Sequence, residues 1–353
     1  MLFGTAVANH KSTHMKEQTI NMITNLLIGQ TAFTQLKTEW DTLASQGMTD
    51  TPFQTLAYQK AWWTHLHPPN SELYTITARE TDNTLLAIGS FYIYEDTLYF
   101  NGCIEETDYL DLICKPADAE RCWTAVFDYL TSDQFPNWQH ISLCNVPEKS
   151  PTRTILPKLA AQKGFSTTES IHEVCPVITL PDTFDNYLQA IDSKQRREIQ
   201  RKLRRAAGAD AKLIIVQPED NLTEAVDTFL DLLQKSTFEK RDWLNDGRRA
   251  VFHDTAQAAM ANGTLQLMFM AVNGRKAAAL FNFHYKNRIW VYNSGLDPEA
   301  FGALSLGVVL TAKAIETAIE LDCHEFDFLR GNETYKYRFG AVDTNIYKIE
   351  ISR

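Results

Sequence analysis

The chain has 353 residues and a formal net charge of −10 at pH 7, with 44% apolar and 22% charged residues. This is the composition of a folded globular protein of about two domains. The acidic balance is a poor match for a nucleic-acid-binding protein, and no apolar run reaches the ~18–20 residues of a membrane span. Six cysteines without a Cys-x-x-Cys pair predict neither a disulfide scaffold nor a zinc site, and they favour a reducing, cytoplasmic compartment.

The first segment, residues 1–30, is polar and without a periodic pattern. It lacks the apolar core of about 7–15 residues that a signal peptide requires. Met15 and Met22 are alternative starts within it. We therefore expect residues 1–30 to be a disordered leader that carries no function.

An internal duplication organises the rest of the chain. Three β-type runs in the first half are matched, in the same order, by three in the second: Glu72–Arg79, Leu85–Tyr94 and Thr97–Asn101, then Thr264–Val272, Lys276–Tyr285 and Arg288–Asn293. Turn-like pairs separate the runs, and Asn273-Gly274 is a strong hairpin signal. The pattern predicts two copies of one supersecondary unit.

Helices complete each copy. Two amphipathic helical stretches precede the strands, and one helix and one strand follow them. In the first copy these are residues 33–46, 54–65, 117–131 and 140–145; in the second they are residues 222–238, 248–262, 305–321 and 324–329. Hairpins followed by a helical crossover predict an α/β fold with a mixed sheet. We place the domains at 31–150 and 181–353, with a proline-containing seam at 151–180.

A basic helix, residues 192–207, opens the second copy. Lys194–Arg205 holds seven basic residues and one acid, a local charge of +6. Arg197, Arg201 and Arg205 recur at helical spacing and could bind phosphates through their guanidinium groups. A solvated helix face paired with acidic neighbours explains the run equally well. Nucleic acid is the weaker interpretation, because no aromatic residues interleave with the arginines.

Two segments of the second copy have the residue types that chemistry needs. A strand leaves through a loop with Gly302 and Gly307 into a helix that Ser305 could cap, which suits an anion such as a pyrophosphate. The second segment, residues 325–341, is a strand followed by crowded polar groups, at the end of a sheet where ligands bind in α/β folds. Structural roles, such as an ion pair of Asp327 with Arg330, are the alternative. Isolated histidines predict no metal site.

Asp327-Phe-Leu-Arg-Gly-Asn-Glu-Thr-Tyr-Lys336, with Phe339-Gly-Ala341, resembles the closing signature of the CelD-type branch of GNAT acetyltransferases. That branch is close to the FemAB-like aminoacyltransferases, which have twin GNAT folds. Pro52-Phe-Gln54 with Trp62-Trp63, the Asp108-Tyr-Leu-Asp111 element, the arginine-rich helix and the glycine loop are similar to further elements of the family, in the same order. The resemblance implies two tandem GNAT-like, mixed-sheet domains.

The resemblance also implies transfer of an acyl group from acetyl-CoA to the amine of a small molecule, an amino sugar or polysaccharide precursor, without metal or nucleic acid. The CoA pyrophosphate would lie on the backbone of Gly302, Ala303, Leu304, Ser305, Leu306 and Gly307. Pantetheine would run along the strand at 290–293, including Tyr292 and Asn293, as an added strand does. Direct attack needs a base, a stabilised oxyanion and a proton donor. The candidates are Asp327 or Glu333 as base, Lys336 for the oxyanion and Tyr335 as acid.

For the acceptor, the expected binding residues are Asp108, Tyr109, Asp111, Arg197, Arg201 and Arg330. Two departures from the family stand out: the loop at 298–301 has no arginine or glutamine before its glycines, and the first copy has no glycine loop at 108–116. We therefore expect the first copy to serve as an acceptor platform. A FemAB-like aminoacyltransferase that uses aminoacyl-tRNA and a non-catalytic GNAT-fold binding protein are the alternatives, and the acidic background disfavours tRNA.

Overall fold

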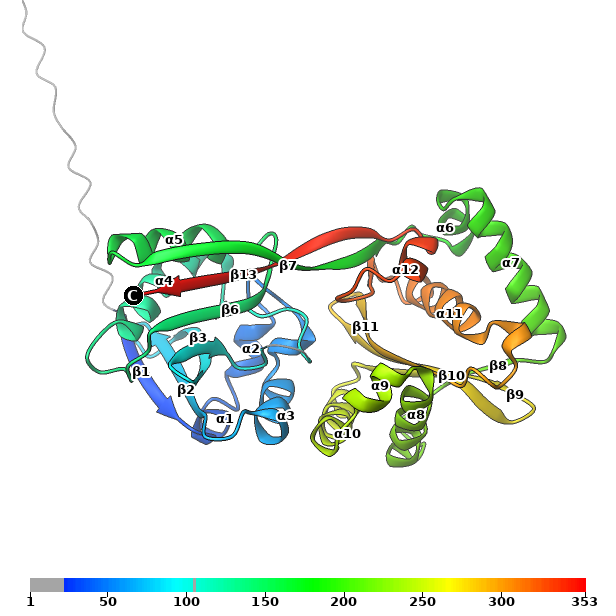
Figure 1. Ribbon diagram of the computed structural model, residues 1–353, viewed down its shortest axis with the longest axis horizontal. Helices are drawn as coiled ribbons and strands as arrows, with labels where there is room; N and C mark the ends of the chain where they lie inside the picture. The colour runs from blue at the N-terminus through cyan, green and yellow to red at the C-terminus, as the bar shows by residue number, and fades with distance from the viewer. Residues whose placement is uncertain (1–21, 104–105) are drawn as a thin grey trace, which may run out of the picture.

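A computed structural model describes residues 22–103 and 106–353. The first half contains β1 (Ile23–Ile28), α1 (Thr31–Gln35), α2 (Trp40–Ala44), the 3₁₀ turn η1 (Pro52–Gln54), α3 (Leu56–Leu66), β2 (Glu72–Arg79), β3 (Leu85–Tyr94), β4 (Thr97–Phe100), β5 (Ile113–Cys114), η2 (Pro116–Asp118), α4 (Ala119–Leu130) and β6 (His140–Pro147). The joining segment contains α5 (Thr152–Gln162) and β7 (Ser166–Thr179) (Figure 1).

The second half repeats this order and adds a final strand. It contains α6 (Phe184–Ala190), α7 (Ser193–Gly208), β8 (Lys212–Ile215), α8 (Leu222–Ser236), α9 (Phe238–Trp243), α10 (Asp246–Ala261), β9 (Leu265–Val272), β10 (Arg275–Tyr285), β11 (Arg288–Leu296), η3 (Gly302–Leu304), α11 (Leu306–Glu320), β12 (Glu325–Asp327), α12 (Thr334–Arg338) and β13 (Val342–Ser352).

One mixed sheet runs through the described residues in the order β1-β2-β3-β4-β6-β13-β7-β12-β11-β10-β9-β8, with β5 paired to β3. In each half the three consecutive strands are antiparallel and the last strand is parallel to its neighbour, β6 to β4 and β12 to β11. The predicted α/β fold with a duplicated mixed-sheet unit is therefore confirmed. At the Asn273-Gly274 turn both residues have positive φ, 51° and 77°, as a two-residue hairpin turn requires.

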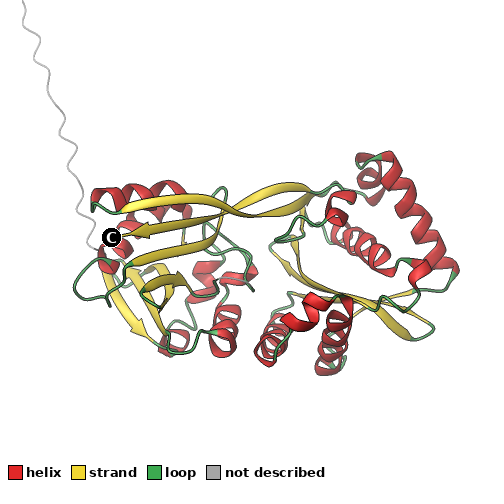
Figure 2. Ribbon diagram, in the orientation of Figure 1, coloured by secondary structure: helices red, strands yellow, loops and turns green. Residues whose placement is uncertain are grey.

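The two halves exchange their last strands. β7 follows α5 of the first half, pairs along its whole length with β13, and ends beside β12 of the second half. β13 starts in the second half and ends paired with β6 of the first half. Figure 2 shows these two strands as the twisted ribbon that joins the halves. The seam expected at 151–180 is thus a helix and a long strand of the sheet, and the expected second domain, 181–353, gives its last strand to the first half.

The leader prediction is wrong for its last residues. Ile23–Ile28 is β1, paired antiparallel with β2, because its apolar residues meet the edge of the first half's sheet. The remainder of the predicted leader, residues 1–21, lies outside the described residues. The single helix expected at 33–46 is two short ones, α1 and α2. Between them the chain turns so that the fully buried Trp40 donates its indole N–H to the carbonyl of Gln54 at 2.8 Å.

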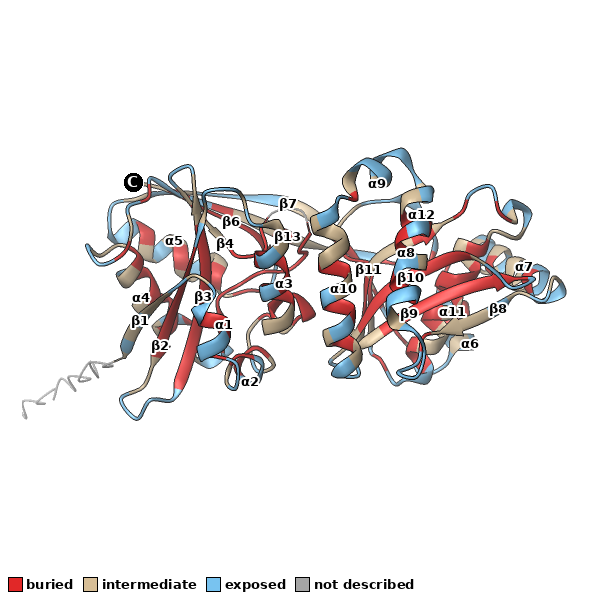
Figure 3. Cartoon of the chain, turned by 90° about the horizontal axis from the view of Figure 1, so that it is seen from below, coloured by how far each residue is buried: buried red, intermediate tan, exposed pale blue. Residues whose placement is uncertain are grey.

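Helices cover both faces of the sheet, and the strands between them are buried (Figure 3). In the first half, α4 and α5 pack Trp123 and Leu156 against a core that also contains Ile349 and Ile351 of β13. In the second half, α11 packs on one face and α8 with α10 on the other. Among the described helices, none is long and apolar enough to cross a membrane.

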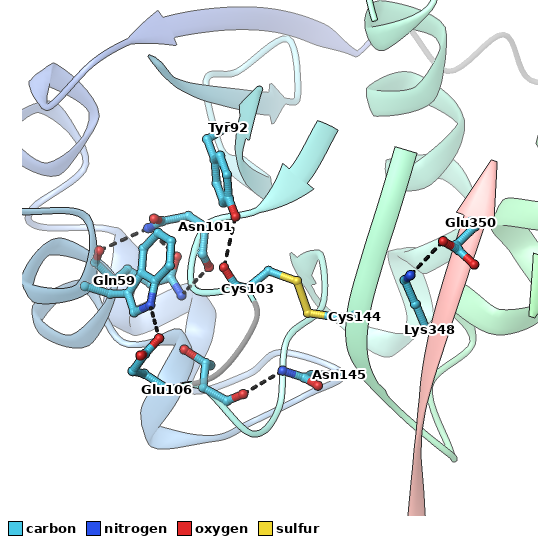
Figure 4. The surroundings of a disulfide bond; sticks show 11 residues. Gln59, Tyr92, Asn101, Cys103, Glu106, Cys144, Asn145, Lys348 and Glu350 are labelled. Atoms are coloured by element: carbon cyan, nitrogen blue, oxygen red, sulfur yellow. Dashed lines mark hydrogen bonds and ion pairs between the residues drawn. A yellow bond between two sulfur atoms is a disulfide. The ribbon is translucent and has the colours of Figure 1, made fainter. Parts of the chain in front are cut away.

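A disulfide joins Cys103, after β4, to Cys144 in β6 (Figure 4). The sequence led us to expect no disulfide scaffold, since the spacing of Cys103 and Cys144 does not show that the fold brings them together. The other four cysteines, Cys114, Cys122, Cys175 and Cys323, are buried and free.

Because β13 belongs to the sheet of the first half, the C-terminal residues contribute to the stability of that half. We expect Ile351→Ala to lower the free energy of unfolding by about 2–5 kcal/mol, because the side chain is fully buried in that core. Urea denaturation followed by tryptophan fluorescence measures this. The control is Glu350→Ala, a half-exposed neighbour, which should change stability by less than about 0.5 kcal/mol. Equal effects of the two substitutions would contradict the exchange.

Candidate functional site

A wedge opens between β11 and β12. The two strands pair only as far as Trp290 opposite Asp327. Beyond this point the chain after β12 has no further pairing with β11 but stays bonded to β7 on its other edge, where the N–H groups of Phe328 and Gly331 donate to the carbonyls of Pro176 and Val174, each at 3.0 Å. The wedge therefore begins after Trp290 rather than at it, which shifts the predicted pantetheine track towards the end of β11.

The wedge leads into a cavity of about 460 Å³, which we call the wedge cavity. Its walls come from β10, β11, the loop after β11, α11 and α12, and they are largely apolar. Among its lining residues are Leu280, Val291, Leu296, Phe301, Leu306, Phe328 and Phe339. A cavity with apolar walls and few polar groups is typical of a small-molecule site.

The N-terminus of α11 lies at this cavity. Phe301 and Ser305 both adopt left-handed backbone conformations, with φ of 53° and 54°, and Ser305 makes no side-chain hydrogen bond as a cap. The first N–H groups of a helix have no acceptor within the helix and carry partial positive charge. Of the predicted loop residues, Gly302, Ser305, Leu306 and Gly307 line the cavity, whereas Ala303 and Leu304 do not.

Side chains from α8 and α9 occupy the open edge of β11. Lys240 Nζ donates to the carbonyl of Ser294 at 2.6 Å, and Ser236 Oγ accepts from the N–H of Leu296 at 2.7 Å. Asn293 Oδ1 accepts from the N–H of Ser294 at 2.9 Å. Burial lowers the pKa of Lys240 to about 8, and the nearby Lys336 contributes in the same direction. The edge expected to receive pantetheine is thus bonded at Ser294 and Leu296.

A second cavity, of about 270 Å³, lies where the two halves meet, and we call it the cleft cavity. It is lined by Glu106, Asp108, Glu173, Trp243, Tyr292, Asn293, Arg330 and Gly331. Arg330 Nε donates to Asp108 at 2.7 Å, and Arg248 pairs with Glu106 at 2.6 Å. The β11 residues 291–294 separate the two cavities, since Val291 and Ser294 line one and Tyr292 and Asn293 line the other.

Asp327 and Tyr109 connect the halves. The Tyr109 hydroxyl donates to Asp327 Oδ2 at 2.8 Å, and the N–H of Leu329 donates to Oδ1 at 2.7 Å. Burial raises the pKa of Asp327 to about 7, and it also raises the pKa of Tyr109. Asp327 is almost fully buried and lines neither cavity. Through these contacts Asp327 positions the segment around Tyr109 relative to the loop after β12.

Lys336 holds the loop after β12. Its buried Nζ donates to the carbonyls of Leu329, Arg330 and Gly331 at 3.1, 2.7 and 2.9 Å. It also pairs with Glu333 at 2.9 Å. Glu333 itself is exposed and lies against Gly331, since a Cβ built on Gly331 would be 2.5 Å from Glu333 Oε2. Of the two predicted bases, Glu333 is therefore the one that lies beside a wall of the cleft cavity.

Tyr335 lines the wedge cavity and packs edge-to-face on Phe328. Partial burial, with Glu333 nearby, raises the pKa of its hydroxyl, so that Tyr335 is a weaker acid than an ordinary tyrosine, and it is protonated at neutral pH as an ordinary tyrosine is. A protonated hydroxyl at the wall of this cavity can donate to a leaving group.

Three predicted acceptor residues lie away from the cleft cavity. Asp111 is buried in the first half, where it accepts from the hydroxyls of Thr49, Ser150 and Thr152, because a buried carboxylate needs such donors. Arg197 and Arg201 lie on α7, which packs against α11 and η3 on the other side of the wedge. Of the predicted set, the structure brings Asp108 and Arg330 together at the cleft cavity, whereas Tyr109 does not line it and bonds Asp327 instead.

Four lining residues of the two cavities were missed in the sequence: Glu106, Glu173, Lys202 and Trp243. Lys240, which lines neither cavity but bonds Ser294, was missed as well. Glu106 lies close to the Asp108-Tyr-Leu-Asp111 element and Lys202 lies within the basic run, so both had a local signal. For Glu173, Lys240 and Trp243 the residues themselves carry no pattern. Among the described residues, no group of three or more His, Cys, Asp or Glu side chains could hold a metal.

The corresponding notch of the first half is filled by its own chain. β4 and β6 pair in parallel only at Thr97–Leu98. Beyond that, the N–H of Leu110 donates to the carbonyl of Asn145, and the Asn145 amide donates to the carbonyl of Thr107. The disulfide of Cys103 closes the same notch (Figure 4). These contacts leave the wedge of the second half as the one open to a donor among the described residues.

Comparison with known proteins agrees with this geometry. Residues 193–337 match the family model described as "Acetyltransferase (GNAT) domain", which includes β11, α11 and β12. Over these residues the second half is thus similar to a GNAT acetyltransferase domain. No match to the sequence is found among curated proteins.

Three solved structures share the fold over most of the chain. The structure titled "Crystal structure of FemX" has a TM-score of 0.63 at 9% identity and covers 88% of this chain and 94% of its own. A conserved protein of unknown function from Bacteroides thetaiotaomicron has a TM-score of 0.59 at 13% identity, with coverages of 89% and 97%. L-PGS from Bacillus licheniformis has a TM-score of 0.50 at 10% identity, with coverages of 79% and 84%. At these identities the likeness establishes the fold.

The raised pKa of Asp327 predicts a pH dependence of stability. In the folded protein Asp327 keeps its proton up to about pH 7, whereas the ordinary pKa of an aspartate is 3.8. The stabilisation that the raised pKa gives the folded state is therefore lost as the pH rises from about 4 to about 7. Asn cannot ionise. We therefore expect Asp327→Asn to gain stability relative to the wild type as pH rises through that window. Urea titrations at several pH values measure it.

The control for this pH series is Asp242→Asn, because the Asp242 side chain is 81% exposed. Its stability difference from the wild type should be constant over the same window. A constant difference for Asp327→Asn as well would show that Asp327 is not held in its protonated form.

Proposed function

We propose that the chain is an N-acyltransferase that takes an acyl group from acyl-CoA in the wedge cavity and transfers it to an amine held in the cleft cavity. The observation that carries the proposal is the juxtaposition of the two cavities at residues 291–294 of β11. In this proposal the thioester lies at residues 291–294, within reach of an amine in the neighbouring cleft cavity, and no covalent enzyme intermediate is needed. The match of residues 193–337 to a GNAT acetyltransferase domain supports it.

The donor side suits a thioester with a diphosphate. The apolar walls fit the pantetheine and acyl parts, and the N-terminus of α11, with Leu306 and Gly307 at the cavity, fits the diphosphate. Gly307 has open space beside it, since a Cβ would meet only Leu296 Cδ1 at 3.8 Å. The pantetheine chain has to replace the bonds of Ser236 and Lys240 on β11, or it pairs with the residues before Ser294 alone.

The acceptor side suits an amine. Glu106, Asp108 and Glu173 give the cleft cavity three carboxylates and Arg330 one cation, so the site favours a ligand that arrives as an ammonium. Arg330 and Arg248 fix the carboxylates of Asp108 and Glu106 by ion pairs. An amino sugar or polysaccharide precursor, with an amine and several hydroxyls, is the acceptor class that we propose.

The reaction is a direct displacement. The bound ammonium first loses one proton to solvent; the resulting amine nitrogen attacks the thioester carbonyl carbon, the C–S bond breaks, and an amide and a thiolate result. We assign Glu333 to accept the proton of the amine, because its carboxylate lies against Gly331 at the cleft cavity. Tyr335 gives its proton to the thiolate. Lys240 and Lys336 supply positive charge for the developing oxyanion, and Lys336 also holds the loop.

One observation favours a different donor. Because Ser294 and Leu296 are already bonded to Lys240 and Ser236, a donor that does not pair with this edge fits without rearrangement. Aminoacyl-tRNA, as in the FemAB-like aminoacyltransferases, is such a donor. Loss of activity after ribonuclease treatment would support it, and activity with purified acyl-CoA that survives ribonuclease would exclude it.

Blocking the wedge cavity tests the donor site. We expect calorimetry to show micromolar binding of acetyl-CoA and of desulfo-CoA to the wild type, and Gly307→Glu to abolish both, because the new carboxylate would lie where the diphosphate binds. Ala161→Glu adds the same charge to the exposed face of α5 in the other half and should leave the affinity unchanged. Absence of binding at millimolar acetyl-CoA and desulfo-CoA would contradict the acyl-CoA proposal.

Removing one hydroxyl tests the proton donor. We expect Tyr335→Phe to lower kcat at least tenfold with little change in the KM for the donor, since the packing on Phe328 is retained. Steady-state kinetics with an amino-sugar acceptor measure it. Tyr337→Phe is the matched control: Tyr337 is also 37% exposed, lies on the same helix, and donates to Asp343 instead. Equal kcat values for the two variants would remove Tyr335 from the mechanism.

A further inference from the structure

The loop that meets the donor has no cation of its own. Residues 297–307 contain Asp297 and Glu299 but neither lysine nor arginine. Asp297 is neutralised by Arg275 at 2.7 Å, and its Oδ1 accepts from the N–H groups of Glu299 and Ala300, so that it shapes the turn. A diphosphate bound at the backbone of this loop therefore needs positive charge from another element.

Helix α7 supplies that charge at the same place. It docks through the buried Ile199 and Ala206 and contacts α11 and η3. Lys202 lines the wedge cavity, and its side chain is only 18% exposed. One turn further, Arg205 Nη1 donates to the carbonyl of Ala303 in η3 at 2.9 Å. Figure 1 shows α7 beside α11, on the side of the second half that faces away from the first.

We propose that Lys202 and Arg205 of α7 bind the diphosphate of the CoA donor, in place of a cation in the loop after β11. This inference rests on the proposed acyl-CoA-dependent function and assigns the residues that recognise the donor. It also assigns the basic helix to the binding of the donor, whereas the sequence led us to expect Arg197 and Arg201 to bind the acceptor.

The neighbouring charges leave these two cations directed towards the loop. Glu198, the acid of the helix, is bound by Arg201 through two bonds of 2.8 and 2.7 Å, and this interaction lowers the pKa of Glu198 to about 2. Lys202 Nζ is 3.5 Å from the same carboxylate, a longer and weaker contact. A guanidinium has five N–H groups, of which the bond to Ala303 uses one.

The long side chains suit this role. Lys202 lines the cavity, and a lysine can bury its stem along apolar walls while its ammonium reaches a charged ligand. Arg205 can bridge a phosphate and the Ala303 carbonyl with different N–H groups of one planar fork. The diphosphate would then lie between these cations and the N-terminus of α11, which adds its partial positive charge.

The test compares ligands with and without phosphate. Calorimetry at two salt concentrations measures binding of CoA and of pantetheine to the wild type and to Lys202→Met/Arg205→Met, which retains apolar stems. The matched control is Arg197→Met/Arg204→Met, which removes two charges from exposed positions of the same helix. We expect the Kd for CoA to rise at least tenfold in the test variant and less than twofold in the control, and the Kd for pantetheine to be unchanged in both.

The outcomes separate the two proposals. Equal CoA affinity of the test variant and the wild type overturns the role of α7 and leaves the proposed function intact. Equal losses in the test and control variants show a general effect of charge, and this also overturns the assignment. A wild type that binds neither CoA nor pantetheine overturns the proposed function itself. Circular dichroism of each variant shows whether α7 still folds.

Discussion

The separation of two paired strands organises this protein. β12 pairs over three residues with β11 on one edge and with β7 on the other, and beyond Asp327 only the bonding to β7 continues, through the N–H groups of Phe328 and Gly331. The wedge, the wedge cavity and the position of the loop at 328–331 all follow from this difference between the two edges. It depends on the length of β7, whose 14 residues reach from the first half to the second while β13 pairs along them in the opposite direction.

The two halves share a topology but have diverged at the same point. In the first, the chain after β4 returns into its own notch and is held by Asn145 and the disulfide of Cys103. In the second, β11 itself continues to Leu296, paired with β10, and the notch stays open. The notch itself is formed by the backbone of two diverging strands, and the loop that follows decides what fills it. A duplicated unit can therefore keep its fold while one copy fills the notch and the other leaves it open for a ligand.

Charges are divided between the two sides of the open wedge. Carboxylates of the first half, Glu106 and Asp108, meet Arg248 and Arg330 of the second half at the cleft cavity. On the far side, the basic helix lies beside a loop in which one of the two acids, Asp297, is already paired with Arg275. The ion pairs at the cleft are partly or fully shielded from water, so each is a directional contact between the halves as well as a feature of the site. An acidic chain thereby presents a basic surface at one place.

Local patterns in the sequence determined the secondary structure, the duplication and the mixed sheet, because hydrophobic periodicity and turn residues such as Asn273-Gly274 act over a few positions. They also indicated the segments at 302–307 and 325–341. The roles within the second of these segments were decided by tertiary contacts: Lys336 faces three carbonyls, and Asp327 is buried against Tyr109. The same holds for Asp111 in the first half, which is enclosed by hydroxyls. The exchange of β13, the disulfide and the side of the wedge on which the basic helix lies were likewise set by tertiary structure. Each depends on which distant elements meet, and no spacing along the chain encodes that distance.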